Sequence, residues 1–252
     1  MKNKNFFFHF SIDDVFDSLI EVTDKKISLK KHYFFKEIYN LWKMYGIRTG
    51  LHLFYQKKIN GKIRNLSEIR DISSELGENW IYFNVHALDP ETPPYKQSIK
   101  DQKKTFKKIF FEIKRFAGNK YLSINTRLHY YSECYELVEY FNENNVKALF
   151  STDRNIGSHR MPKKISDELL NFGKSSFKKL KFIRTDLRVE WLAKNKIHYK
   201  DLKEKISRIL NKKKILIIYS HEYEFKKKNV IYALRKIMNI LSKKLYFRNI
   251  KP

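Results

Sequence analysis

Carboxylate and imidazole side chains follow short apolar runs at five places in the chain. These runs end in Ser11-Ile12-Asp13-Asp14, Asn84-Val85-His86-Ala87-Leu88-Asp89, Arg127-Leu128-His129-Tyr130, Ser151-Thr152-Asp153 and Ser220-His221-Glu222. Oxygen and imidazole donors of this kind suit zinc or another divalent first-row metal. The single cysteine, Cys134, excludes an intrachain disulfide and a multi-cysteine zinc finger. The residue types therefore predict a metal-assisted reaction.

The segments that would position these residues are of two alternating kinds. Short runs rich in Phe, Ile, Tyr and Val predict strands at Phe6–Phe10, Ile47–Phe54, Trp80–Val85, Tyr121–Asn125, Lys147–Phe150, Lys181–Arg184 and Ile215–Tyr219. Lysine- and glutamate-rich segments with apolar residues at helical spacing predict helices at Ser28–Tyr45, Leu66–Leu76, Ser98–Ala117, Ser132–Asn144, Lys163–Phe172, Tyr199–Leu210 and Lys227–Lys243.

Strict alternation of strands and helices predicts an α/β fold with a parallel sheet, either doubly wound or closed into a barrel. No glycine-rich loop follows the first strand, which argues against a nucleotide-binding doubly wound sheet. No linker, repeat or low-complexity tract divides the sequence, so we expect one domain over residues 1–252. In a parallel barrel the carboxyl ends of the strands meet at one rim, where function gathers.

The ordered set of strand endings resembles the polysaccharide deacetylases over nearly the whole chain. Phe10-Ser11-Ile12-Asp13-Asp14-Val15 is similar to their Thr-Phe-Asp-Asp-Gly signature, and Arg127-Leu128-His129-Tyr130 to their Arg-Pro-Pro-Tyr signature. Asp153 resembles the acidic residue of the next motif, and His221-Glu222 the closing His-Asp. The chain more narrowly resembles a bacterial subgroup with His-Ala-Leu-Asp and Arg-Leu-His-Tyr segments.

This resemblance implies a single (β/α)7 barrel of the distorted TIM type found in glycoside hydrolases and deacetylases. It also implies a metal-dependent hydrolase that removes an acetyl group from an N-acetylated sugar. The implied catalytic base is Asp13, which Arg127 orients. The implied acid is His221, which Asp153 or Glu222 orients. Tyr130 is implied at the oxyanion site and, like Glu222, in contact with the substrate.

The metal ligands implied by the resemblance are Asp14 and His86. The family's metal motif is His-Ser/Thr-x-x-His-Pro, and Pro90 stands where its second histidine would be. The third ligand must therefore come from elsewhere. His129 stands at the adjacent strand end, and Asp89 is the alternative. The expected cofactor is one divalent metal, with zinc preferred.

Some of these residues also have a simpler interpretation. Asp13 and Asp14 suit the N-cap of a helix, and His86 could be a hydrogen-bonded core histidine. His9 and His52 lie inside strands and are interpreted as core residues. At the level of function, the missing histidine keeps open a non-catalytic, deacetylase-like binding module. A metal-dependent hydrolase of another amide or ester substrate is the third alternative.

The net charge of +26 comes mostly from lysines spread along the whole chain. Such a distribution indicates compositional bias, and no nucleic-acid recognition motif accompanies it. We therefore expect no specific nucleic-acid partner, whereas an anionic substrate or a membrane surface is a better match. The N-terminal apolar run meets Asp13 too soon for a signal peptide, so the cytoplasm is the expected location.

Overall fold

The computed structural model describes residues 6–77, 79–155, 157–158, 160–242 and 247–249. Its strands are β1 (Phe6–Val15), β2 (Thr49–Phe54), β3 (Gln56–Ile59), β4 (Lys62–Asn65), β5 (Ile81–Ala87), β6 (Asn125–Thr126), β7 (Ala148–Ser151), β8 (Lys174–Phe177), β9 (Leu180–Arg184), β10 (Leu187–Arg188), β11 (Ile215–His221) and β12 (Phe247–Asn249). Its α-helices are α1 (Asp17–Asp24), α2 (Tyr33–Tyr45), α3 (Ile99–Phe116), α4 (Val138–Glu143), α5 (Lys163–Phe172), α6 (Val189–Lys194), α7 (Tyr199–Lys213) and α8 (Lys228–Ser242).

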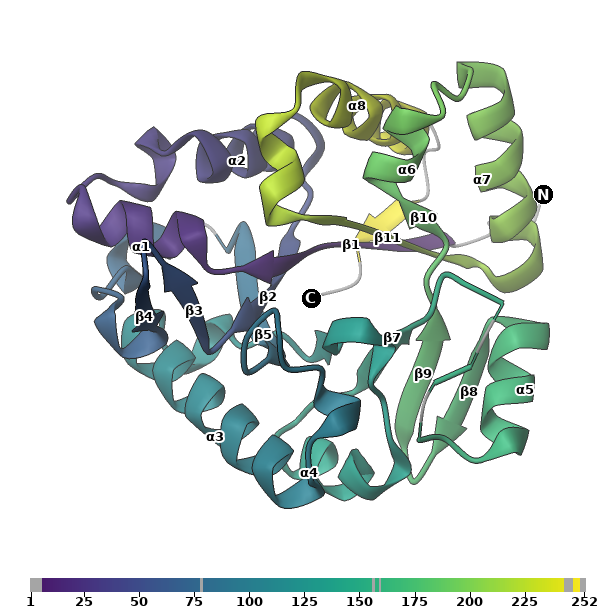
Figure 1. Cartoon of the computed structure of the whole chain (residues 1–252). Coiled ribbons are helices and arrows are strands. Elements are labelled where there is room, and N and C mark those ends of the chain that lie inside the picture. The colour runs from purple at the N-terminus through teal and green to yellow at the C-terminus, as the bar shows by residue number, and fades with distance from the viewer. Residues whose placement is uncertain (1–5, 78, 156, 159, 243–246, 250–252) are drawn as a thin grey trace.

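Two parallel sheets form the centre of the fold, and helices surround them (Figure 1). In the first sheet the strand order is β10-β11-β1-β2-β5, and β12 pairs with the start of β1. In the second the order is β6-β7-β9-β8, with β8 antiparallel to β9. The strands β3 and β4 form a separate antiparallel hairpin. All seven predicted strands are present, and they follow the order of an α/β barrel.

The ring of strands is interrupted at two places, so the barrel is not closed by continuous pairing. Between β5 and β6 the only bridge among the described residues joins Phe83 to Leu122. The predicted strand Tyr121–Asn125 shortens here because the Asn84 side chain bonds the carbonyls of Ser123 and Asn125. At the other gap, the chain leaves β9 beside β7 and pairs again with β11 as β10.

Three predicted helices are wrong in extent. The helix expected over Ser28–Tyr45 begins at Tyr33, because Leu29–Lys31 form a separate 3-10 turn and His32 is extended. Residues 66–76 form two short 3-10 turns, because the Arg115 guanidinium bonds the carbonyls of Leu66 and Ile69 and draws them away from helical partners. The predicted helix Ser132–Asn144 begins late, since Cys134 pairs with Arg160 in an extended bridge. The last helix is described to Ser242, and Lys243 lies outside the described residues.

The interior of the barrel is apolar along most of its length and polar near the carboxyl ends of the strands. Buried aromatic side chains such as Phe10, Phe83 and Trp80 make up much of the core. Among the buried polar residues are His9, Ser11, Asp13, His52, Asn84, His86, Thr126, Arg127, Ser151, Thr185 and Ser220. As far as the structure describes the chain, all of these side chains make hydrogen bonds except His9, whose ring packs on Phe150, and this concentration marks the rim where the side chains interact with one another. No helix in the described ranges has the length and apolar character needed to cross a bilayer.

Candidate active site

The end of β1 brings two adjacent aspartates to one site. Successive side chains of a regular strand point to opposite faces. Here the pairing of β1 with β2 shifts register between Ile12 and Val15, and Asp14 adopts φ 62°, a left-handed conformation unusual for a residue other than glycine. The bulge turns Asp14 toward the rim while Asp13 stays buried, so both carboxylates face the centre of the barrel. The alternative that these residues cap a helix is wrong.

Asp13 is held by a cation on one side and an imidazole on the other. One nitrogen of the Arg127 guanidinium lies 3.0 and 3.1 Å from the two carboxylate oxygens, and Nδ1 of His52 lies 2.7 Å from Oδ1. Arg127 also donates to Ser11 and Thr185, and its guanidinium stacks 4.2 Å from the centroid of the Tyr219 ring. The predicted orientation of Asp13 by Arg127 agrees with this geometry.

His52, interpreted from the sequence as a core residue, contacts the proposed base. Burial lowers the pKa of His52 to about 4, with the neighbouring Arg127 cation adding to this and Asp13 opposing it. The ring is therefore neutral near pH 7 and donates its Nδ1 proton to Asp13. For Asp13, burial alone would raise the pKa, but the charge of Arg127 and the bond to His52 outweigh it and hold the pKa well below its usual range.

Asp14, His86 and His129 converge on one point. The Asp14 Oδ1 lies 3.1 Å from His86 Nε2 and 3.4 Å from His129 Nδ1, and these two nitrogens lie 3.1 Å apart. A tetrahedral zinc ion with bonds of about 2.0–2.1 Å separates its ligand atoms by about 3.4 Å. The triangle of donor atoms therefore has the size that a divalent metal requires.

Both imidazoles are also held in the tautomer that a metal needs. His86 Nδ1 lies 2.6 Å from the Arg127 carbonyl, so this nitrogen carries the proton and Nε2 presents its lone pair. His129 Nε2 lies 3.3 Å from the Pro90 carbonyl, so in the neutral ring Nδ1 presents its lone pair in the same way. Second contacts of this kind orient metal-binding histidines in proteins. Pro90, which cannot coordinate through its side chain, thus contacts the expected third ligand, His129, through its backbone.

Asp89, the alternative third ligand, is committed elsewhere. Its Oδ1 accepts the Thr92 backbone N–H at 2.8 Å, and its Oδ2 accepts the Gln56 amide at 3.2 Å. A second group of possible donors, Asp13, His52 and His86, is fully buried. The Arg127 cation already neutralises Asp13 there, so the group formed by Asp14, His86 and His129 is the better metal site.

His221 pairs with a carboxylate that the sequence analysis did not select. Its Nδ1 lies 2.5 Å from Glu190 Oε1, while Glu190 Oε2 accepts the Ser220 hydroxyl at 3.0 Å. Burial lowers the pKa of His221, but the hydrogen bond and charge of Glu190, together with Asp14 and Asp13, raise it above its ordinary value. The expectation that Asp153 or Glu222 orients His221 is therefore wrong, since Glu190 holds Nδ1 and leaves Nε2 as the reactive nitrogen.

Asp153 belongs to a neighbouring hydrogen-bonded cluster. It accepts the hydroxyls of Tyr131 and Tyr219 at 2.9 and 3.1 Å and pairs with Arg188 at 3.0 Å. The Tyr219 ring lies 5.4 Å from the His221 ring, so Asp153 reaches the proposed acid only through this tyrosine. Asp153 supports the wall of the site and makes no contact with His221 among those described.

Glu222 has a structural role. Its carboxylate accepts the backbone N–H groups of Phe16, Asp17 and Ser18 at 2.9, 3.0 and 2.6 Å. These are the first N–H groups of α1, which lacks a side-chain cap of its own. Because Glu222 is 3% exposed and its oxygens are occupied, the expectation that it contacts substrate is wrong.

Tyr130 directly follows His129 and is 53% exposed, as a substrate contact requires. It adopts φ 54°, and its ring packs 4.3 Å from that of His129. Non-glycine residues in this conformation often mark functional loops. The structure thus brings together the expected residues Asp13, Asp14, His86, Arg127, His129, Tyr130 and His221, and adds His52 and Glu190 to them.

Solved structures share this arrangement of strands and helices. The chain matches the Bc1960 peptidoglycan N-acetylglucosamine deacetylase over 98% of its own length and 92% of that chain, with a TM-score of 0.54 at 12% identity. The chain has the polysaccharide deacetylase fold. No family model and no curated protein sequence matches it.

The deacetylase fold is shared by proteins that differ in chemistry. A 4-alpha-glucanotransferase from Thermococcus litoralis matches with a TM-score of 0.59 at 12% identity. The match spans 98% of this chain but only 39% of that enzyme. A mutant of BA3943, a pseudoenzyme of the CE4 family, matches with a TM-score of 0.50 at 11% identity over 99% of this chain and 66% of that one. At these identities the likeness establishes the fold, and the function must be argued from the side chains.

Proposed function

We propose that this protein is a metal-dependent hydrolase that removes an acetyl group from an N-acetylated carbohydrate. The observation that carries this proposal is the convergence of Asp14, His86 and His129, with both imidazoles in the ligating tautomer. Beside them stand a paired carboxylate, Asp13, and a paired imidazole, His221. A metal site flanked by one proton acceptor and one proton donor is the arrangement that amide hydrolysis needs.

When bound, a divalent metal would supply a Lewis acid for the acetyl carbonyl and lower the pKa of the attacking water. Asp13 would accept the proton of that water, with Arg127 and His52 keeping its carboxylate ionised and in place. His221, whose pKa is raised by the hydrogen bond and charge of Glu190, would donate a proton from Nε2 to the departing amine. The Tyr130 segment would lie beside the developing oxyanion.

The test combines metal content with acetate release. Purified protein should bind one equivalent of zinc or a similar divalent ion, and N-acetylated oligosaccharides should release acetate only with that ion present. Asp14→Ala and His86→Ala should each abolish both metal binding and acetate release. Stoichiometric metal without acetate release from any N-acetylated probe would contradict the assigned reaction.

The rival proposal is a non-catalytic module with a deacetylase fold, and one observation favours it. Asp13 is 2% exposed and held by two donors, and a carboxylate whose pKa lies well below its usual range is a weak base. A module of this kind would bind carbohydrate without turnover and would not need the metal. Carbohydrate affinity that is unchanged by removal of the metal, together with no acetate release, would support the rival.

A further inference from the structure

Two adjoining cavities lie beside the candidate active site and lack an assigned role. One, of about 340 Å³, is lined by Asp153, Arg154, Asp186, Leu187, Arg188, Trp191, Leu192 and Lys205. The other, of about 300 Å³, shares Asp153, Asp186 and Lys205 with it and extends to Arg184, Lys212 and Lys213. These volumes are at the lower end of the range for small-molecule sites, and each could hold about one sugar unit.

Positive charge dominates these two cavities. The lining contains six cations, Arg154, Arg184, Arg188, Lys205, Lys212 and Lys213, against the two carboxylates Asp153 and Asp186. Both carboxylates are already neutralised, because Asp153 pairs with Arg188 at 3.0 Å and Asp186 with Lys213 at 2.8 Å.

The other four cations are not paired with these two carboxylates. Arg184 is fixed by neutral oxygens of Leu170, Arg154 and Asn155, and Lys212 donates to the Asn171 carbonyl. Within the described part of the chain, no carboxylate lies within salt-bridge distance of Arg154, Arg184, Lys205 or Lys212. Two of these cations line the first cavity and three line the second, with Lys205 common to both, so the adjoining cavities make a site for an anion.

An aromatic ring stands beside these cations. Trp191 lines the first cavity, is 50% exposed, and has the Lys205 ammonium 5.1 Å from its ring centroid. An exposed indole face packs on apolar surface such as the face of a sugar ring, while the ammonium beside it attracts a negative substituent. The two side chains together suit a sugar that carries an acidic group.

The cavities also connect to the proposed chemistry. Trp191 directly follows Glu190, which holds His221, and Asp153 reaches the same histidine through Tyr219. Arg188 lies over the Tyr219 ring at 5.1 Å, so the wall that surrounds His221 is shared with the first cavity, and a saccharide that spans this wall would reach both the acetamido site and Trp191. The geometry points to a subsite, which we call the basic subsite, formed by Arg154, Arg184, Arg188, Trp191, Lys205 and Lys212.

We infer that the basic subsite selects carbohydrate bearing a negative group, a carboxylate or a phosphate, next to the N-acetylated unit. This inference rests on the proposed function for its substrate, although binding can be measured without turnover. It assigns a specific purpose to part of the +26 net charge, which the sequence analysis interpreted as bias.

The test compares matched probes by calorimetry in 50 mM salt. The probes are a tetrasaccharide of alternating glucuronate and N-acetylglucosamine, its carboxyl-reduced neutral counterpart, and N-acetylglucosamine 6-phosphate against N-acetylglucosamine. At least one acidic probe should bind about tenfold more tightly than its neutral partner, and 300 mM salt should reduce that preference because the subsite is open to solvent. The arm that responds identifies carboxylate or phosphate.

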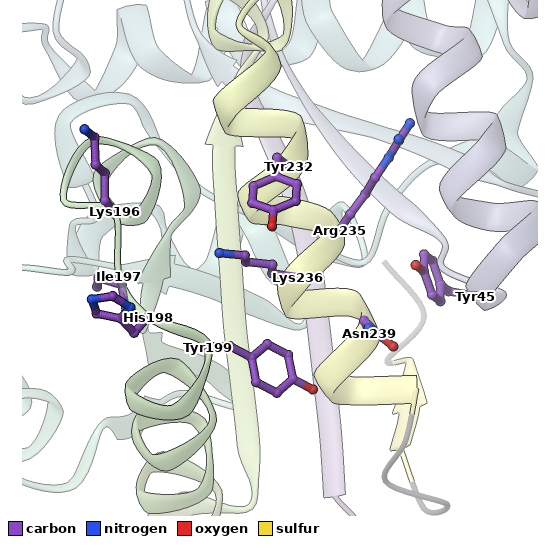
Figure 2. A pocket seen from close by; sticks show the side chains of 9 residues that line it. All are labelled: Tyr45, Lys196, Ile197, His198, Tyr199, Tyr232, Arg235, Lys236 and Asn239. Carbon is purple, nitrogen blue, oxygen red and sulfur yellow. The ribbon is translucent and has the colours of Figure 1, made fainter.

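Two variants locate the binding. Arg154→Ala combined with Lys205→Ala should weaken the acidic probe about tenfold and leave the neutral one unchanged. The control is Lys236→Ala, in a separate cavity of about 710 Å³ lined by Tyr45, Tyr199, Tyr232 and Arg235 among others (Figure 2). This control removes an equally exposed lysine far from the metal ligands in sequence and should leave both affinities unchanged.

Three results would overturn the inference. The first is equal affinity for the acidic and neutral probes in both pairs, and the second is a loss of affinity in the Lys236 variant as large as that in the double variant. The third is a short DNA duplex that binds more tightly than either acidic probe and depends on Lys205 to the same extent. Failure of the proposed hydrolysis would look different. The acidic preference would then persist, while no probe would release acetate with metal present.

Discussion

Glu190→Gln should lower the pKa of His221 and move the alkaline limit of any activity with it. Glu190 Oε1 lies 2.5 Å from His221 Nδ1, and both side chains are mostly buried. Glutamine has nearly the same shape and can still accept the Nδ1 proton, so the change removes charge and leaves the hydrogen bond. The perturbation therefore isolates the electrostatic contribution of this pair.

The magnitude follows from the geometry. A hydrogen bond to a charged partner is worth about 1.5–3 kcal/mol and a neutral one about 0.5–1.5 kcal/mol, so the substitution removes a difference of about 1–1.5 kcal/mol. The pair keeps 15–17% exposure, which screens it in part. Since one pKa unit corresponds to about 1.4 kcal/mol, we expect the pKa of His221 to fall by about one unit. Since a general acid works while protonated, activity should decline from a correspondingly lower pH.

The assay is an NMR titration of the His221 imidazole in the zinc-loaded protein, which needs no substrate. Glu224→Gln is the matched control, because Glu224 is buried beside the same strand end but pairs with Lys227. A fall in the Glu190 variant with no change in the control is the expected result. A His221 pKa that stays within 0.3 units of the wild type, an interval of about 0.4 kcal/mol, would refute the assignment of Glu190.

Three other predictions concern the metal, α1 and the surface charge. The metal affinity of His129→Ala, measured by competition with a chelator, should be at least tenfold weaker than that of the wild type. Full metal retention in this variant would reject His129 as a ligand. Asp13→Asn should keep the metal and lose acetate release. Glu222→Ala should lower the free energy of urea unfolding by about 3 kcal/mol, because the first N–H groups of α1 lose a charged acceptor, and a loss below 1 kcal/mol would reject this role. Binding to duplex DNA should be weak and should vanish in modest salt, and salt-resistant binding to a defined sequence would reject the interpretation of the net charge.

Most strands of the barrel were predictable because they are rich in apolar residues, and β1, β2, β5, β7 and β11 were all expected close to their observed places. The mainly polar strands β3, β4 and β8 were not expected. The two-residue strand β10 and the short helix α6 carry no periodic signal. Glu190 lies on α6, so the element that positions it was not expected either. The predicted ends of the helices were wrong where a distant side chain, such as that of Arg115, hydrogen-bonds to the backbone carbonyls.

The candidate site shows a similar division. Residue types and order indicated Asp13, Asp14, His86, Arg127 and His129, because these stand at strand ends. Which residue contacts which was not accessible, since it depends on the bulge at Asp14 and on neighbours far apart in the chain. His52 was assigned to the core because it lies inside a predicted strand, and it is fully buried. Only the fold shows that its buried face meets Asp13.

Arg127 links the two halves of the proposed chemistry through different atoms. Its guanidinium holds Asp13, while its backbone carbonyl accepts the His86 Nδ1 proton and so fixes the nitrogen that faces the metal site. A side-chain substitution at position 127 removes the first contact and leaves the second in place. The metal site should therefore tolerate loss of the guanidinium better than Asp13 does, because an unpaired buried carboxylate costs several kcal/mol. The sequence motif suggests only that Arg127 orients Asp13. Because Arg127 directly follows β6, its backbone also orients His86.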